Sequence, residues 1–231
     1  MRRSLAPELL DTLPAEDPSA IGARRDLQRV NAVMRHGPLC EAAIERLLEG
    51  RAPRSLVELG CGDAKFLAGI ARRKSSAWTP LEVWLVDRVS IVSASTLQVF
   101  EAAGWNVHPV QADVFEWLKT PAQAEVCLMN LFLHHFEAEQ IATLMRGIAS
   151  YADAFVACEP RRSVRALWAS HVVGLLGCNA VTRHDAVVSV RAGFAGREIS
   201  RLWDAGGAWE LSEGAAGTFS HLFTARRTKT T

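Results

Sequence analysis

The chain has 231 residues, of which 49% are hydrophobic and 22% charged, a balance that excludes a disordered chain and suits a single globular domain with its own core. Its 26 basic and 25 acidic residues leave a formal charge of +1, which gives no global field for attracting nucleic acid and favours a small-molecule partner. Five cysteines without a CxxC pair predict neither a disulfide framework nor a metal site, and favour a reducing cytoplasm.

The first fifty residues divide into two parts. Residues 1–20 contain three prolines and predict a loosely packed leader, without the apolar core of a signal peptide. Residues 24–50 have apolar side chains at helical spacing and predict two helices divided at Gly37 and Pro38. No apolar run in the chain approaches the roughly 20 residues that a membrane span needs.

Strands and helices then alternate along the chain. The apolar runs predict strands at 55–60, 81–87, 106–113, 124–133 and 154–160, with helices at 64–74, 90–103 and 137–151 between them. Two further helices are expected at 161–177 and 182–193, and two strands at 199–212 and 217–227. We therefore expect an α/β fold with a Rossmann-like, doubly wound, mostly parallel sheet, a C-terminal antiparallel hairpin and helices on both faces.

The stretch LVELGCGDAKF, residues 56–66, follows the first strand and has two glycines bracketed by the acids Glu58 and Asp63. Ligands of such sheets bind at the carboxyl ends of the strands, so this loop is the first candidate site. A pyrophosphate would be repelled by the two acids, and Lys65 takes the place of the third glycine of a GxGxxG fingerprint. The loop instead predicts a ligand with a cationic end.

This loop resembles the first motif of the class I S-adenosylmethionine-dependent methyltransferases, an acid two residues before a GxGxG loop. The matching residues are Glu58, Gly60 and Gly62, with Ala64 at the third glycine. The resemblance implies S-adenosylmethionine as cofactor, with its methionine moiety above the loop. It also implies a methyltransferase domain over residues 51–231, with the leader and helices of residues 1–50 covering its active site.

Three later stretches match further motifs of that family in order. Asp87, with Arg88 beside it, ends the second strand and can accept hydrogen bonds from both ribose hydroxyls. The resemblance places Asp113 and the backbone of Val114 near the adenine, and Asn130 beside the sulfonium. Each has a structural alternative, because Asp87 could cap a helix and Asp113 could belong to a turn.

The candidate catalytic residues follow the fourth of these motifs. A phenolic acceptor needs a base to remove its proton, and histidine is suited to this at neutral pH. We expect His135 or His134 in that role, the alternative being a histidine that caps a helix or packs on its neighbour. Glu159 ends a later strand and either orients a hydrogen-bond donor or serves as a structural acid.

Residues 160–193 are expected to contact the acceptor or to form core. Leu167, Trp168, His171, Val172 and Leu175 make an apolar helical surface, for which core is the favoured interpretation. A second group could bind an acceptor carboxylate or form a capping and ion-pair cluster, and consists of Arg183, His184, Asp185 and Arg191.

The stretches CEPRRS and GLLGCNAVTRHDAVVSVRAGF resemble small bacterial methyltransferases associated with polyketide synthases of the chalcone-synthase type. The resemblance implies O-methylation of a phenolic or polyketide-derived small molecule in secondary metabolism. Alternatives are C-methylation of a quinone precursor and a catalytically silent, cofactor-binding partner subunit. An NAD-dependent reductase is disfavoured because no Tyr-x-x-x-Lys pair exists around Tyr151, the sole tyrosine. A homodimer is the candidate assembly, and nucleic acid is not an expected acceptor.

Overall fold

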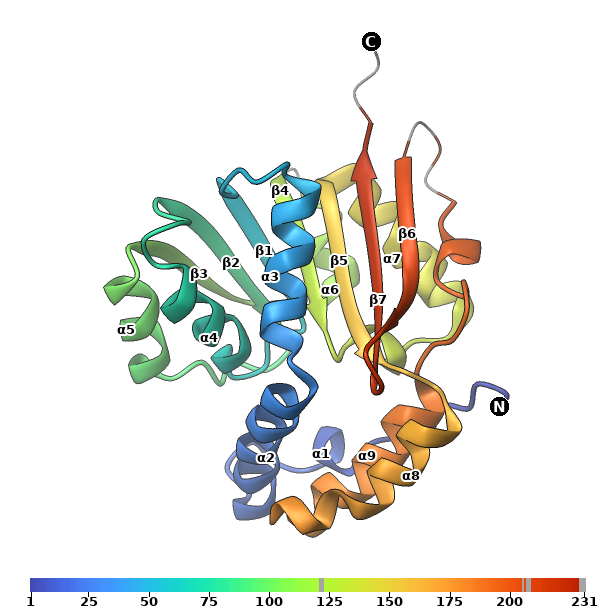
Figure 1. The fold of residues 1–231 in the computed structure, drawn as a ribbon. Coiled ribbons are helices and arrows are strands. Elements are labelled where there is room, and N and C mark those ends of the chain that lie inside the picture. The colour runs from blue at the N-terminus through green and yellow to red at the C-terminus, as the bar shows by residue number, and fades with distance from the viewer. Residues whose placement is uncertain (121–122, 205, 207–208, 229–231) are drawn as a thin grey trace.

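The computed structural model describes residues 1–120, 123–204, 206 and 209–228 (Figure 1). Seven described strands form one sheet in the order β3-β2-β1-β4-β5-β7-β6. Their bounds are β1 (Ser55–Leu59), β2 (Leu81–Asp87), β3 (Trp105–Gln111), β4 (Ala124–Asn130), β5 (Ala152–Pro160), β6 (Trp209–Ala216) and β7 (Ser220–Arg227). Strands β1 to β5 are parallel, and β7 pairs antiparallel with both β5 and β6. The predicted mostly parallel sheet with a C-terminal hairpin is confirmed.

The central strands are continuous apolar runs because helices cover both faces of the sheet. Leu56 and Leu59 of β1 have no exposed surface, and Leu56 pairs with Val83 of β2 on one side and Val126 of β4 on the other. The hairpin begins later than predicted. The 3₁₀ helix η3 (Ser200–Leu202) occupies part of the expected strand at 199–212, and residues 205, 207 and 208 of that strand lie outside the described residues.

Two hydrophobic cores lie on opposite faces of the sheet. The first is formed with α3 (His36–Leu47), α4 (Lys65–Lys74) and α5 (Ala94–Ala102), and the second with α6 (Val114–Trp117), α7 (Ala138–Tyr151) and η3. Because both faces of β1 and β4 are buried in these cores, their sequences do not alternate between apolar and polar residues. The expected helices on both faces are confirmed.

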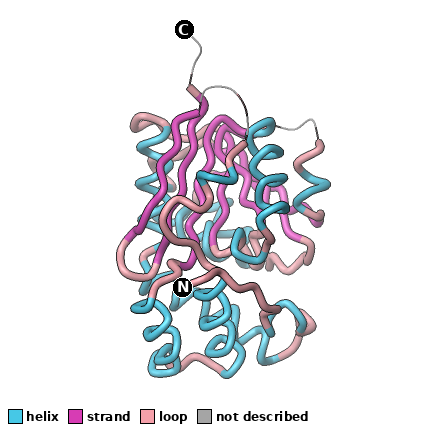
Figure 2. Tube along the Cα trace, turned by 90° about the vertical axis from the view of Figure 1, so that its right-hand side faces the viewer, coloured by secondary structure: helices cyan, strands magenta, loops and turns pink. Residues whose placement is uncertain are grey.

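The remaining helices form a cap over the carboxyl ends of the parallel strands (Figures 1 and 2). They are α1 (Leu9–Thr12), α2 (Pro18–Met34), α8 (Val164–Val172), η2 (Val173–Leu176) and α9 (Ala180–Ala192). The cap is joined internally by Asp26 of α2, which is buried and accepts hydrogen bonds from the Asn179 backbone at 2.7 Å and the Thr182 hydroxyl at 3.1 Å. Segments from both ends of the chain therefore make one cover.

The break between α2 and α3 falls earlier than predicted. It lies at Arg35, whose backbone is left-handed with φ of 57°, and α3 begins at His36. The expected division at Gly37 and Pro38 is wrong because a proline in the first turn of a helix removes an N–H group that has no helical partner there. Among the described residues no helix is both long and apolar enough to cross a bilayer.

Candidate active site

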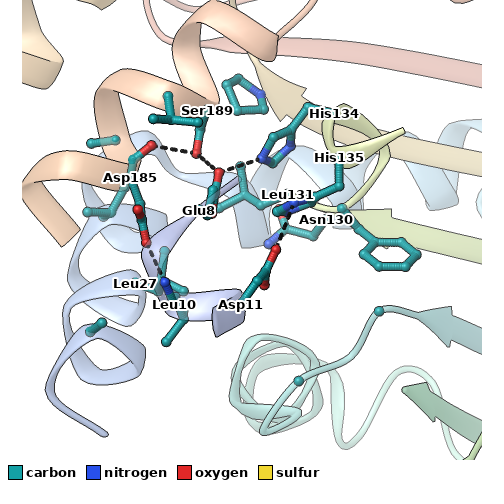
Figure 3. A pocket seen from close by; sticks show the side chains of 18 of the residues that line it. Glu8, Leu10, Asp11, Leu27, Asn130, Leu131, His134, His135, Asp185 and Ser189 are labelled. Atoms are coloured by element: carbon teal, nitrogen blue, oxygen red, sulfur yellow. Dashed lines mark hydrogen bonds and ion pairs between the residues drawn. The ribbon is translucent and has the colours of Figure 1, made fainter. Parts of the chain in front are cut away.

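A cavity of about 1060 Å³ lies between the cap and the carboxyl ends of β1, β2 and β4. Figure 3 shows the side that faces α1 and α9. Ten of the sequence-predicted site residues line this cavity, and they are Glu58, Gly60, Gly62, Asp87, Arg88, Asp113, Val114, Asn130, His134 and His135. The fold thus brings residues from four separate loops to one space.

The loop after β1 needs its glycines for two reasons. Gly60 and Gly62 have φ of 73° and 54°, in the left-handed region that favours glycine. A Cβ on Gly60 would lie 2.3 Å from the ring of Phe132, whereas one on Gly62 would meet nothing within 4 Å. Ala64 also has a left-handed φ, of 56°, at the position where the family motif has its third glycine. The loop is therefore tightly packed at Gly60 and open to the cavity at Gly62.

Glu58 is a buried carboxylate without a full set of partners. Its side chain is on β1, the residue is 2% exposed, and Oε2 accepts no hydrogen bond within the described structure. Burial raises its pKa well above the usual range, and the charges of Asp63 and Asp87 raise it further. An orphaned carboxylate on the cavity wall is costly unless a ligand supplies a donor or a positive charge. A cationic ligand fits this place.

Asp87 is held by the backbone of the loops on either side of it. Oδ2 accepts a hydrogen bond from Gly62 N–H at 2.8 Å, and Oδ1 accepts one from Val89 N–H at 3.0 Å. A carboxylate oxygen can accept more than one hydrogen bond, so the group can still receive two hydroxyls of a ligand. Lys65 forms an ion pair with Asp63 at 2.7 Å, which places a cation beside Asp63 rather than beside Glu58.

Asp113 caps a helix and also lines the cavity, and Val114 and Arg88 line the cavity as well. Asp113 is the N-cap of α6 and accepts a hydrogen bond from Phe115 N–H at 2.8 Å. Val114 begins α6 and is buried against the second core, and Arg88 is exposed at the cavity edge. The capping alternative thus describes one role of Asp113, and its place on the cavity wall describes a second.

Asn130 ends β4 and is fixed by His36 from α3. Asn130 Oδ1 lies 2.7 Å from His36 Nδ1, so His36 donates there, and its Nε2 accepts from the hydroxyl of Ser220 at 2.8 Å. Burial lowers the pKa of His36 to about 4, with the Asn130 contact partly opposing the shift. The neutral ring holds the Asn130 amide so that its NH₂ group faces Asn31 at 3.3 Å and the cavity. His36 was not predicted as a site residue, because nothing in the local sequence pattern distinguishes it from other residues of a helix.

His134 lies between the carboxylates of Glu159 and Glu8, the second of which is seen in Figure 3. Its Nδ1 is 2.7 Å from Glu159 Oε2 and its Nε2 is 3.3 Å from Glu8 Oε1. Burial alone lowers the pKa of His134, but the bonds to Glu159 and Glu8 outweigh it and raise the pKa to about 9. A ring that is charged at neutral pH and bonded at both nitrogens is a poor general base.

Glu159 lies behind His134 instead of facing the cavity. It is fully buried and accepts hydrogen bonds from the backbone N–H groups of Phe132 and Leu133 at 3.1 and 2.8 Å. Burial raises the pKa of Glu159, but its bond to His134 and these amides bring it below the usual range. The carboxylate therefore orients His134 and the 3₁₀ helix η1 (Leu133–His135).

His135 faces the cavity and has a different environment. Its side chain is 25% exposed, and Nδ1 lies 3.3 Å from Asp11 Oδ2 in α1. A carboxylate at this nitrogen can fix the orientation of the ring. Of the two predicted histidines, His135 has the geometry that a base requires.

Glu8, His134 and His135 each bring one metal-ligating atom within 4.8 Å of the others, a grouping that the sequence did not predict. Within the described structure, Glu8 contacts His134 Nε2 at 3.3 Å and accepts a hydrogen bond from the Ser189 hydroxyl. These contacts join the first two members of the group to each other and to α9.

The segment at 160–193 divides between cavity wall and surface. Val172 and Leu175 line the cavity, but Leu175 is 87% exposed and Trp168 is 73% exposed. The favoured interpretation of this face as core is wrong, because the inward side of α8 is made by the smaller residues Ala166 and Ser170. Sequence spacing alone does not tell which side of a helix is covered.

The predicted polar cluster of α9 serves the cap. Asp185 accepts hydrogen bonds from the backbone N–H groups of Leu9 and Leu10 at 2.8 and 3.0 Å, and Ser4 N–H donates to Arg191 O at 3.1 Å. Of the two interpretations of this cluster, capping is the one that Asp185 fits, since it accepts the first two amides of α1. Residues 1–12, expected to be a loosely packed leader, are held against α9 by these bonds.

No protein-family model matches the chain, and no curated protein matches it in sequence. Solved structures match over nearly the whole chain. An O-methyltransferase family protein from Burkholderia thailandensis is 18% identical, with a TM-score of 0.59 over 93% of this chain and 63% of that one. The fold is shared with methyltransferases. The chain spans less than two thirds of that first structure.

Two other matches are consistent with this fold. The plantazolicin methyltransferase BpumL, solved in complex with S-adenosylhomocysteine, is 11% identical, with a TM-score of 0.64 and 92% of both chains covered. The pyocyanin biosynthetic protein PhzM is 19% identical, with a TM-score of 0.60 over 92% of this chain and 60% of that one. At these identities the comparison establishes the Rossmann-like methyltransferase fold.

Proposed function

We propose that the protein transfers a methyl group from S-adenosylmethionine to an oxygen of a small phenolic or polyketide-derived acceptor. The observation that carries this proposal is the orphaned carboxylate of Glu58 on the cavity wall, beside the open backbone of Gly62. A cofactor with a cationic end supplies the missing partner. The methyltransferase neighbours support the same class of reaction.

The cofactor would be held by groups at the carboxyl ends of four strands, β1 to β4. Glu58 and the loop through Gly62 take the methionine end, and Asp87 accepts the ribose hydroxyls while remaining bonded to Gly62 N–H at 2.8 Å. Asp113 and Val114 lie at the adenine end, with Arg88 at the edge of the cavity. Asn130, whose NH₂ group donates to Asn31 at 3.3 Å and which lines the cavity, would lie beside the sulfonium.

When bound, the cofactor supplies a methyl group on a positively charged sulfur. His135 would accept the proton of the acceptor hydroxyl, and Asp11, 3.3 Å away, would orient its ring. With the cofactor held by Glu58, Gly62 and Asp87, the acceptor oxygen would take the methyl group as the carbon–sulfur bond breaks, so that the products would be a methyl ether and a neutral thioether. His134 and Glu159 hold η1 so that His135 faces the cavity. The cap excludes water and aligns the two reactants.

The experiment that tests this proposal is calorimetric titration of the protein with S-adenosylhomocysteine and with NADH. We expect binding of the first, no binding of the second, and a loss of at least about tenfold in affinity in Asp87→Ala, since hydrogen bonds to a charged group contribute about 1.5–3 kcal/mol. Asp153→Ala, an exposed aspartate of β5 that does not line the cavity, is the control and should bind as the wild type. NADH binding would contradict the proposal.

Turnover is tested on a panel of alkylresorcinols and hydroxyquinones. Products are detected by mass spectrometry, and the position of the added methyl group is determined by NMR. Methyl ethers are the expected products. Methylation at a ring carbon would favour the quinone alternative, and cofactor binding without turnover on any acceptor would favour a silent partner subunit.

A further inference from the structure

The outer side of α8 and η2 carries a row of exposed apolar side chains, which we call the apolar stripe. Its members are Val164 (61% exposed), Trp168 (73%), Val172 (51%), Leu175 (87%) and Leu176 (45%). Positions four apart lie on one face of a helix, so the first three share a face. An indole that is three quarters exposed is unusual for a side chain of this size.

The exposed apolar residues of the molecule gather at one end. Large hydrophobic side chains that are exposed occur, among the described residues, only in residues 1–33, at Val89 and in the apolar stripe. Residues 9–33 and the stripe belong to the cap, which Figures 1 and 2 show at one end of the sheet. A gathering of this kind marks a contact surface.

The charge of this surface is asymmetric although the chain as a whole is nearly neutral. Residues 160–184 contain four arginines and no aspartate or glutamate. Arg165 is exposed and lies three residues before Trp168. The side chain of Arg183 packs on Gly174 of η2, since a Cβ added to this glycine would lie 2.9 Å from Arg183 Cδ. Nearby Asp26 and Asp185 are buried in the bonds that hold the cap together. The exposed charges flanking the stripe on α8 and α9 are positive.

We propose that the apolar stripe docks on an anionic lipid bilayer. A helix with tryptophan and aliphatic residues on one face and arginines beside them has the composition of helices that lie in the membrane interface. The indole and aliphatic side chains enter the acyl boundary, and Arg165 and Arg183 contact lipid phosphates. No described helix spans a bilayer, so the protein would lie on its surface.

The position of the cavity favours lipid over a protein partner. Val172, Leu175 and Leu176 of the stripe also line the cavity, as do Val33 and Val89. Docking by this face would set the cavity opening against the acyl region, where an amphiphilic phenol is dissolved. This last step rests on the proposed function, whereas the docking does not.

The test is flotation of the full chain with vesicles of phosphatidylcholine containing 30% phosphatidylglycerol, compared with phosphatidylcholine alone. We expect binding to the anionic vesicles that weakens in 0.5 M NaCl. Arg165→Glu with Arg183→Glu should weaken binding about tenfold or more, since each cation near an anionic surface contributes about 1 kcal/mol. Trp168→Ala with Leu175→Ser should weaken binding about tenfold or more as well, because these apolar side chains no longer enter the acyl boundary. Arg146→Glu, an exposed arginine of α7 outside the cap, is the control for a reversed surface charge and should bind as the wild type.

Each variant is also titrated with S-adenosylhomocysteine, so a failure of docking is distinguished from a failure of the proposed function. Wild-type affinity for this ligand in Arg165→Glu with Arg183→Glu, two residues outside the cavity lining, together with loss of flotation, supports docking by the stripe. Flotation that is absent for the wild type, or equal for wild type and stripe variants, overturns the proposal. A dimer that dissociates in Trp168→Ala with Leu175→Ser, without flotation of the wild type, would assign the stripe to a second copy of the chain.

Discussion

At the scale of single residues, Glu58 connects the fold with the ligand. A buried carboxylate without a partner destabilises the free protein, because its pKa is raised and the charged form is disfavoured above the usual pKa of 4.5. The same group stabilises a bound cation. Active sites commonly trade stability for function in this way.

Replacement of Glu58 by glutamine should therefore have opposite effects on stability and binding. At pH 7 we expect the free energy of unfolding of the ligand-free variant to rise by about 1–3 kcal/mol, from removal of an uncompensated buried charge. Affinity for S-adenosylhomocysteine should fall at least about tenfold. Urea unfolding and calorimetry measure the two quantities. Lower stability together with unchanged affinity would show that Glu58 is a structural acid.

His135 and His134 are neighbours with different chemistry. We expect His135→Gln to lower kcat about 100-fold or more, as loss of a general base does, with little change in cofactor affinity. Asp11→Asn should cause a smaller loss of kcat, because the His135 ring loses the carboxylate that orients it. Single-turnover rates across pH 5–9 check this. A His135→Gln enzyme with wild-type kcat would remove His135 from the mechanism.

At the scale of elements, His134 ties α1 to the sheet. It links Glu8, just before α1, to Glu159 at the end of β5, and Arg3 adds hydrogen bonds to the carbonyls of His134 and Phe136 at 3.0 and 2.9 Å. The pKa of His134 is raised to about 9 and that of Glu8 is lowered to about 2. The two pKa shifts arise largely from the same contact between His134 and Glu8, so its free-energy contribution counts only once.

The pH dependence of stability follows from these directions. The His134 contribution is fully present below about 6.5 and is lost as pH rises through about 9, whereas the Glu8 contribution is present above about 4.5 and is lost as pH falls through about 2. We expect the free energy of unfolding to fall by on the order of 3 kcal/mol between pH 6 and 9.5, and to change less in His134→Gln. Urea denaturation at several pH values measures this. Parallel curves for the two proteins would contradict the network.

The elements also show what sequence patterns can predict. The parallel strands and the glycine loop could be predicted because apolar runs and close turns are local properties of the chain. Glu8, Asp11 and His36 could not be assigned to the site, since they contact residues between 94 and 126 positions away. The exposure of Trp168 was mispredicted because periodicity defines a helix face without telling what covers it.

At the scale of the whole molecule, the cap and the sheet enclose the cavity. Asp185 of α9 accepts the amides of Leu9 and Leu10 of α1, so these amides report whether the helices of the cap are held together. We expect S-adenosylhomocysteine to slow their hydrogen exchange and to leave the amides of α7 unchanged. Equal slowing throughout the chain would indicate global stabilisation without a specific effect on the cap.

The most direct test of the whole account is a crystal structure with S-adenosylhomocysteine bound. We predict its amino end beside Glu58, its ribose hydroxyls on the carboxylate of Asp87 and its sulfur near Asn130. The ligand found outside this cavity, or a phosphate group held by the Gly60–Gly62 loop, would contradict it.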